Sequence, residues 1–116
     1  KVKDVAALEA RLETAKAENR PVMLDFYADW CVSCKEMERF TFSDPKVQAR
    51  LQNMLLLKAD VTANTDADKA LLKRFNLFGP PGLIFWNTAG EQSDFKVIGC
   101  EKRDKVLTSI DSALGK

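Results

Sequence analysis

The chain of 116 residues is long enough for one domain with its own core and too short for two. Hydrophobic residues make up 46% of it and charged residues 30%, which is typical of a globular protein that folds without disulfide staples. The net charge of +1 gives no electrostatic reason to expect nucleic acid or an acidic membrane surface as a partner. No apolar run approaches the roughly 18 residues of a membrane-spanning helix, and the first residues do not have the charged-then-apolar pattern expected of a signal peptide.

Two features of the composition exclude common kinds of site. The chain contains no histidine, which excludes a Cys–His pair or a Ser–His–Asp triad. Three cysteines without histidine cannot supply the four ligands of a Cys/His zinc site, so no metal is expected. A disulfide scaffold is not expected either, because small secreted scaffolds carry more cysteines, usually in even number.

Helical and strand-like segments alternate along the chain. Apolar residues at helical spacing predict helices, and short apolar runs between Pro, Gly and Asn predict buried strands. In the first half of the chain we predict a helix from residue 5, capped by Asp4 and ended by residues 19–21, then a strand over 21–28, a helix over 31–40 and a short helix led by Pro45 and capped by Ser43 or Asp44. In the second half we predict a strand over 54–61, a helix capped by Thr65 or Asp66 and stopped at Asn76, strands over 83–86 and 95–98, and a closing amphipathic helix over 101–114.

This order predicts an α/β fold. Strands separated by helices imply a parallel portion of the sheet. The last two strands are a short turn apart and should form an antiparallel hairpin. We therefore expect a mixed central β-sheet flanked by helices, in a single domain over residues 1–116 that is either a mature protein or one domain of a longer one.

Cys31 and Cys34 form a C-x-x-C pair that follows a predicted strand and opens a helix. Beside a strand–helix–strand pattern this spacing indicates a redox pair. The corner should expose the first sulfur and bury the second, and the free N–H groups of the helix start favour a thiolate at Cys31. That thiolate would form a mixed disulfide with a partner, which Cys34 then resolves. The alternatives are a static disulfide, which stabilises little across so short a loop, or two buried small residues.

The segment 25–35 resembles the active-site segment of thioredoxins, and a proline loop precedes the third strand as in that fold. Over nearly the whole chain, segments 27–38, 41–47 and 60–64 more closely resemble the C-terminal periplasmic domain of the DsbD family, bacterial transmembrane thiol:disulfide interchange proteins. The resemblance implies a thioredoxin-like fold and a periplasmic domain of an inner-membrane protein. It also implies electron transfer from the membrane domain to the N-terminal periplasmic domain, which supplies disulfide isomerases and cytochrome c maturation.

Two carboxylates are expected to modulate the cysteine pair. Asp25 interrupts an apolar strand at the position where thioredoxin-like proteins keep a buried acid. We expect it to accept the proton of Cys34, with a pKa raised by desolvation, unless it is a solvated aspartate at a sheet edge. Glu38 lies one turn after Cys34, where the family places a second acid that should raise the cysteine pKa. The alternative is an exposed helix glutamate.

Three further residues are expected to form the docking surface. Pro81 resembles the cis-proline that faces the cysteines in this fold, the alternative being a trans Pro-Pro loop. Pro80 has no N–H, so a strand-like contact to a partner's backbone should keep only the Pro80 carbonyl. Trp30 either contacts the partner or packs against the helix. Cys100 departs from the family and is expected to be a buried inert thiol or, if exposed, a site of stray mixed disulfides.

The predicted function is electron relay by dithiol–disulfide exchange, with the Cys31–Cys34 disulfide in place of any cofactor. Partners are expected to be proteins met briefly through mixed disulfides by a monomeric domain. Two alternatives remain open. A stand-alone thioredoxin or a cytochrome c maturation reductase would use the same chemistry with other partners. A thioredoxin-fold binding module would keep the fold and leave the cysteines idle.

Overall fold

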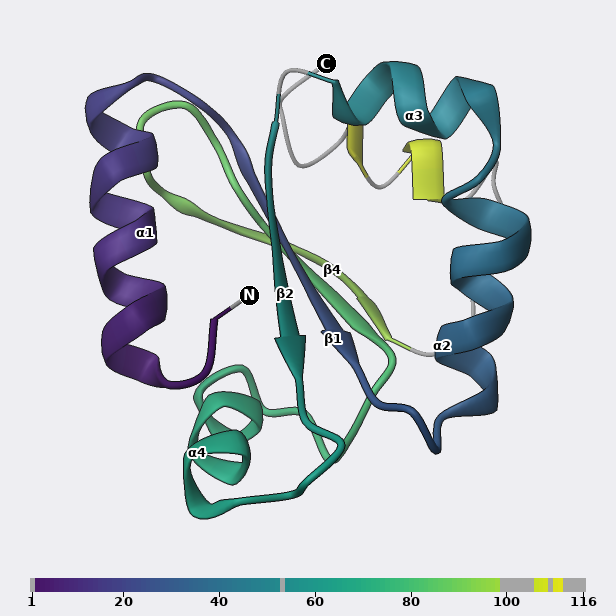
Figure 1. The fold of residues 1–116 in the computed structure, drawn as a ribbon. Coiled ribbons are helices and arrows are strands. Elements are labelled where there is room, and N and C mark those ends of the chain that lie inside the picture. Colours follow the sequence, from purple (N-terminus) through teal and green to yellow (C-terminus); the bar gives the residue numbers. More distant parts are fainter. Residues whose placement is uncertain (1, 53, 99–105, 109, 112–116) are drawn as a thin grey trace.

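Helices and strands follow one another along the chain largely in the order that the sequence pattern predicts. The computed structural model describes residues 2–52, 54–98, 106–108 and 110–111. Its elements, drawn in Figure 1, are α1 (Val5–Ala17), β1 (Val22–Tyr27), α2 (Val32–Glu36), the π-helix η1 (Met37–Thr41), α3 (Pro45–Leu51), β2 (Leu55–Asp60), α4 (Asp66–Arg74), β3 (Gly82–Trp86) and β4 (Gln92–Ile98).

Short-range interactions explain where the helices begin and end. The carboxylate of Asp4 accepts a backbone N–H of the first turn of α1 at 2.7 Å. Thr65 and Asp68 cap the start of α4 reciprocally, each side chain accepting the other residue's N–H. Pro45 occupies the first turn of α3, where its missing N–H is not needed. Asn76 has a φ of 59°, in the left-handed region, and turns the chain away after α4.

The four strands form one mixed sheet in the order β2-β1-β3-β4. Strand β1 runs parallel to β2 and antiparallel to β3, and β4 is antiparallel to β3. The predicted mixed sheet is therefore confirmed. β4 begins at Gln92, earlier than the predicted 95, because the hairpin turn closes through Asn87, whose N–H donates to the Glu91 carbonyl at 3.0 Å.

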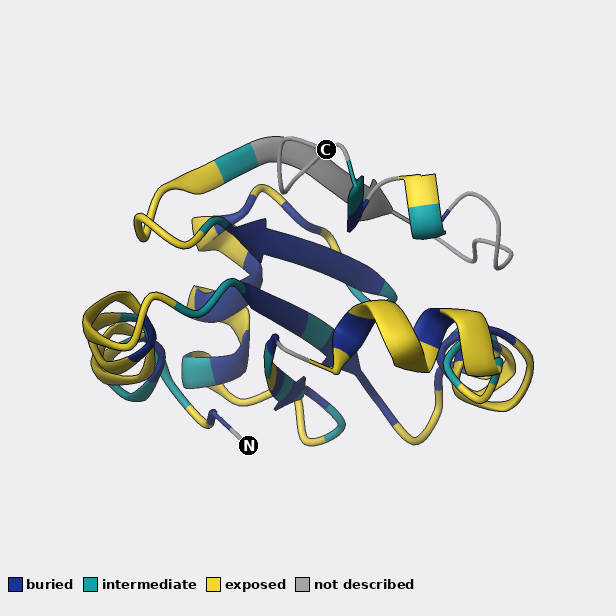
Figure 2. Ribbon diagram, turned by 90° about the horizontal axis from the view of Figure 1, so that it is seen from above, coloured by how far each residue is buried: buried dark blue, intermediate teal, exposed yellow. Residues whose placement is uncertain are grey.

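Side chains alternate between the two faces of the sheet, and each face has its own core. Seen from above in Figure 2, the buried strands lie between α1 on the left and α2 and α3 on the right. Leu24 and Phe26 of β1 belong to the cluster that includes Leu8 of α1. Met23 belongs to the other cluster, with Met37 of η1 and Val47 of α3. Because strand residues alternate, Asp25 shares the face of Met23.

The segment predicted as one helix over 31–40 changes its winding part of the way along. After α2, the N–H of Phe42 donates to the carbonyl of Met37 at 2.8 Å, five residues back, which is the hydrogen bond of a π-turn. The wider turn leaves Phe40 exposed and lets Phe42 pack on the second core. Helical periodicity predicts the helix and does not reveal this extra residue in its last turn.

The predicted closing helix lies mostly outside the described residues. Its described part, 106–108 and 110–111, is helical, and Val106 and Ile110 are buried in the second core. Cys100 lies outside the described residues. Among the residues that the structure describes, no helix has the length and apolar character needed to cross a membrane.

Candidate redox site

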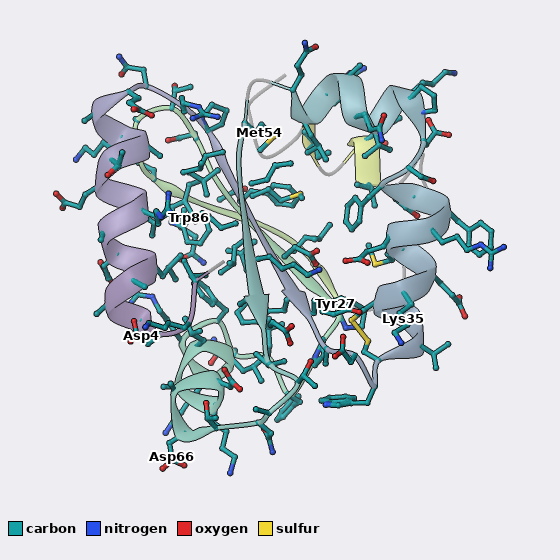
Figure 3. All side chains as sticks on the ribbon, in the orientation of Figure 1. Asp4, Tyr27, Lys35, Met54, Asp66 and Trp86 are labelled. Carbon is teal, nitrogen blue, oxygen red and sulfur yellow. A yellow bond between two sulfur atoms is a disulfide. The ribbon has the colours of Figure 1, made fainter. Side chains whose placement is uncertain are left out.

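Cys31 and Cys34 form a disulfide at the corner between β1 and α2, as their spacing predicts. Figure 3 shows it as a yellow bond between the labelled Tyr27 and Lys35. Their Cα atoms are 5.3 Å apart. Cys31 caps α2, and its Sγ accepts the backbone N–H of Cys34 at 3.1 Å. This donor supports negative charge on Cys31 Sγ when the pair is reduced.

The two cysteines differ less in solvent exposure than predicted, since the first sulfur was expected to be exposed and the second buried. Cys31 is 7% exposed and Cys34 4%, so both residues are buried in the disulfide form, and both belong to the core cluster that includes Phe26. They differ in their hydrogen-bond partners instead. Cys34 Sγ lies 3.7 Å from the carbonyl oxygen of Phe26, which would accept a hydrogen bond from the Cys34 thiol in the reduced form. The surroundings therefore favour a thiolate at Cys31 and a thiol at Cys34.

The loop that leads into Cys31 is fastened to the loop after β2. The N–H of Asp29 donates to the Thr62 hydroxyl at 2.9 Å, and the indole N–H of Trp30 donates to the Thr62 carbonyl at 3.0 Å. The Thr62 hydroxyl in turn donates to Asp60. Trp30 is nevertheless 59% exposed, so its ring is held in one place and presented to solvent beside the disulfide.

The proline loop lies next to the same end of β1. The Pro80–Pro81 peptide bond is cis, and both prolines are half-buried. Gly82, the next residue, pairs in the sheet with Phe26. The carbonyl of Phe26 faces Cys34 Sγ. The sheet register therefore sets Pro81 beside the end of the strand that leads to the cysteines.

Asp25 lies one residue before that carbonyl and is half-buried on the face covered by η1. Burial raises the pKa of Asp25 from 3.8 to about 7; the ammonium of Lys58 opposes this and the charge of Glu38 adds to it. A carboxyl group with such a pKa exchanges protons readily near neutral pH. The expected elevation of the Asp25 pKa is thus present, and its main cause is desolvation.

Glu38 is paired rather than free. Lys58 Nζ lies 2.8 Å from Glu38 Oε1 and 3.9 Å from the centre of the Tyr27 ring. Burial lowers the pKa of Lys58, but the hydrogen bond and charge of Glu38 outweigh it, so the Lys58 pKa is raised. The positive charge of Lys58 therefore offsets the negative charge of Glu38. Both residues act on Asp25, whose pKa Lys58 lowers and Glu38 raises.

These three charged residues line one groove of about 500 Å³ between β2 and η1–α3. Its remaining walls are mainly apolar and include Met54 and Leu57. Neither cysteine lines this groove. The predicted residues thus form two groups. The cysteines lie at the disulfide corner with Trp30 and the two prolines, whereas Asp25 and Glu38 lie in the groove with Lys58. Among the described residues, no group of three or more Cys, Asp or Glu side chains could hold a metal ion.

Lys58 and Thr62 were missed by the sequence reasoning. Lys58 interrupts an apolar strand just as Asp25 does, and the register of β1 with β2 makes the two residues direct partners. The signal was therefore a second charge in a second buried strand. Thr62 lies in segment 60–64, which carried the family resemblance, but only the loop contacts show what it does.

Comparison with known proteins identifies the family. The family model described as thioredoxin-like matches residues 4–87. The chain is 54% identical to the thiol:disulfide interchange protein DsbD of Ralstonia nicotianae over 99% of its own length, and 56% identical over 73% of its length to DsbD of Salmonella typhimurium. It spans 19% of the Ralstonia protein and 15% of the Salmonella protein, so it corresponds to only a part of these curated relatives.

Solved structures give the same result. The oxidised C-terminal domain of Neisseria meningitidis DsbD aligns over 96% of this chain and 97% of that domain, with a TM-score of 0.81 and 42% identity. A thioredoxin from Thermus thermophilus aligns over 95% of this chain and 83% of that one, with a TM-score of 0.75 and 25% identity. The chain belongs to the thioredoxin-like family and, within it, to the C-terminal domains of the DsbD thiol:disulfide interchange proteins.

Proposed function

We propose that this domain carries two electrons at a time as the dithiol and disulfide forms of Cys31 and Cys34. The observation that carries the proposal is the hydrogen bond from the Cys34 N–H to Cys31 Sγ at a strand-to-helix corner, 3.1 Å long. It distinguishes the two sulfurs and makes Cys31 the better nucleophile.

The exchange proceeds in two steps. The Cys31 thiolate attacks a partner disulfide, which forms the Cys31–partner bond and releases one partner thiolate. Cys34 then loses its proton and attacks Cys31 Sγ, which closes the intramolecular disulfide and releases the second partner thiolate. Asp25 is the proposed proton acceptor for Cys34, because its pKa of about 7 suits transfer near neutral pH.

The proposed place of this exchange is the periplasm, in a domain of an inner-membrane protein. The similarity to DsbD over 99% of the chain supports a relay that receives electrons from a membrane domain and passes them to an N-terminal periplasmic domain, and so to disulfide isomerases and cytochrome c maturation. Trp30, Pro80 and Pro81 are the proposed docking residues. In this proposal the chain acts as a single domain and exchanges electrons through its Cys31–Cys34 disulfide.

A redox titration tests the exchange itself. The chain is equilibrated with glutathione buffers of graded potential, and the thiols are counted by alkylation and mass spectrometry. We expect one transition with two-electron slope, unchanged in Cys100→Ser. An absence of interconversion would support the binding module instead and overturn the proposal.

Trapping tests the relay. The Cys34→Ala variant should form a stable mixed disulfide through Cys31 with the oxidised N-terminal periplasmic domain of the full-length protein, and Cys31→Ala should form none. If the purified N-terminal domain yields no adduct while a small disulfide does, the exchange stands and the assigned partner is wrong.

A further inference from the structure

A second groove, of about 460 Å³, lies along α4 and shares no lining residue with the groove that contains Asp25. Leu72 and Leu77, both buried, provide its apolar part. Phe78 lines it as well and is the most exposed large apolar side chain among the described residues. Phenylalanine is among the aromatic residues that are enriched in protein interfaces, so Phe78 at this groove is suited to packing against a partner.

Two lysines give this groove a positive charge. Lys69 and Lys73 are one turn apart on α4, and both line the groove and are exposed. Neither makes an ion pair with another described residue, whereas Arg74, their neighbour on the same helix, binds Glu9 at 2.7 Å. Of the two acids at the start of α4, Asp68 is occupied in the helix cap and Asp66 does not line the groove. Within the part of the chain that the structure describes, no acid therefore pairs with the two lysines where they face the groove.

Two lining residues of the groove lie close in the chain to segments that surround the disulfide. Asn64 lies two residues after Thr62, whose carbonyl accepts the Trp30 indole N–H. Phe78 lies two residues before Pro80. A polypeptide whose disulfide reaches Cys31 between Trp30 and the proline loop would therefore pass next to the groove.

We propose that this groove receives an acidic segment of the protein whose disulfide reacts at Cys31, an inference that rests on the proposed function. Carboxylates of the segment pair with Lys69 and Lys73, and an apolar neighbour packs on Phe78. Charge pairs at the rim of an interface act mainly on the association rate and weaken with salt. The groove thus selects among disulfide partners before any bond is exchanged.

The test uses the reduced 116-residue chain and two synthetic disulfide-linked peptides of equal length. One peptide carries Asp and Glu with a single Leu beside its cystine, and the other carries Lys in place of the acids. Stopped-flow measures the second-order rate of reduction. At about 10 mM ionic strength, where charges act over about 30 Å, the acidic peptide should react about tenfold faster than the basic one. The ratio should approach one in about 1 M salt.

Matched variants locate the effect. The double variant Lys69→Glu, Lys73→Glu should abolish or invert the preference. Its control, Lys3→Glu with Lys46→Glu, makes the same change in net charge on exposed lysines elsewhere and should retain the preference. Phe78→Ser should slow the acidic peptide several-fold, while Phe40→Ser, another exposed phenylalanine, should not.

A neutral substrate, 2-hydroxyethyl disulfide, separates this proposal from the one on which it rests. All variants should reduce it at the wild-type rate. If even the wild type fails to reduce it, the proposed exchange is wrong. If the wild type reduces it but reacts equally with both peptides, or if both double variants lose the preference alike, the groove is not the docking site.

Discussion

The two faces of the sheet are built from alternate residues of the same strands, yet they differ in what they bury. The face toward α1 and α4 is apolar, and its aromatic centre is a pair of edge-to-face contacts that Phe75 makes with Phe26 and Trp86. The face toward α2, η1 and α3 contains Asp25, set against Lys58 and Glu38. One strand therefore supports an apolar core on one side and a carboxyl group with a raised pKa on the other.

The difference between the two faces shows that Asp25 occupies its position at a cost in folding stability. A carboxyl group in a partly dry position is costly when ionised, and an apolar residue would pack there at lower free energy. Lys58 reduces the penalty by its charge, but burial still dominates and the Asp25 pKa stays near 7. The fold itself does not require an ionisable side chain at this position, where an apolar one would pack.

Phe75→Ala should show the largest effect and should act on stability alone. Removing the ring leaves a cavity between Phe26 and Trp86, and the free energy of unfolding should fall by about 3–5 kcal/mol. Chemical denaturation measures the loss, and the reduction rate of 2-hydroxyethyl disulfide by the folded variant serves as the control. A loss below about 1 kcal/mol would mean that this face is not the stabilising one.

Asp25→Asn should show the next largest effect, with opposite sign at alkaline pH. The folded-state pKa of about 7 lies above the ordinary 3.8, so Asp25 contributes stability below about pH 4 that is lost as pH rises through about 7. At pH 8 the variant should be more stable than the wild type by about 2 kcal/mol, which discounts the full shift for partial exposure. Denaturation from pH 4 to 9 measures both, and equal pH slopes in the two proteins would contradict the assignment.

The same variant should slow the second step of exchange. Without a proton acceptor, Cys34 closes the disulfide more slowly, and the mixed disulfide should accumulate during turnover. Rapid quenching followed by mass spectrometry detects that adduct. If Asp25→Asn resolves the adduct as fast as the wild type at every pH, Asp25 has no part in proton transfer.

Thr62→Val should have a smaller effect, confined to the disulfide corner. The variant loses the hydroxyl that binds the Asp29 N–H, so stability should fall by about 1 kcal/mol. Hydrogen exchange of the Asp29 amide should become faster, whereas that of β1 amides should follow only the change in global stability. Unchanged Asp29 exchange would show that the corner does not depend on this contact.

Glu38→Gln and Lys58→Met should have the smallest effects, in opposite directions. Glu38 raises the pKa of Asp25 and Lys58 lowers it, so the first variant should lower that pKa and the second raise it. Carboxyl chemical shifts against pH measure both. Alkylation of Cys31 against pH in Glu38→Gln tests whether Glu38 also reaches the cysteines, and an unchanged profile would confine it to Asp25.

Local patterns in the sequence were sufficient for the disulfide corner. Cys31 and Cys34 meet because two residues separate them in a first helical turn, and that geometry does not depend on the rest of the fold. Asp25 was recognisable because a charge in an apolar strand requires an explanation. The helix ends at Asp4, Pro45 and Asn76 follow from equally local rules.

What was missed depends on contacts between distant segments. Lys58 acts on Asp25 only because the parallel register of β1 and β2 places the two residues side by side. Thr62 matters because its loop meets the loop before Cys31. The extra residue in η1 accompanies the packing of Phe42 on the second core, a tertiary contact that periodicity does not report. The groove along α4 likewise exists only once the 75–81 loop folds back against that helix.

The most direct test of the central claim compares the two sulfurs in isolation. Chains that keep only Cys31 or only Cys34, each with Cys100→Ser, are reacted with 2-hydroxyethyl disulfide from pH 5 to 9. The account predicts that the Cys31-only chain reacts at least about tenfold faster at pH 7, because the Cys34 N–H supports its thiolate. Equal rates, or a faster Cys34-only chain, would contradict it.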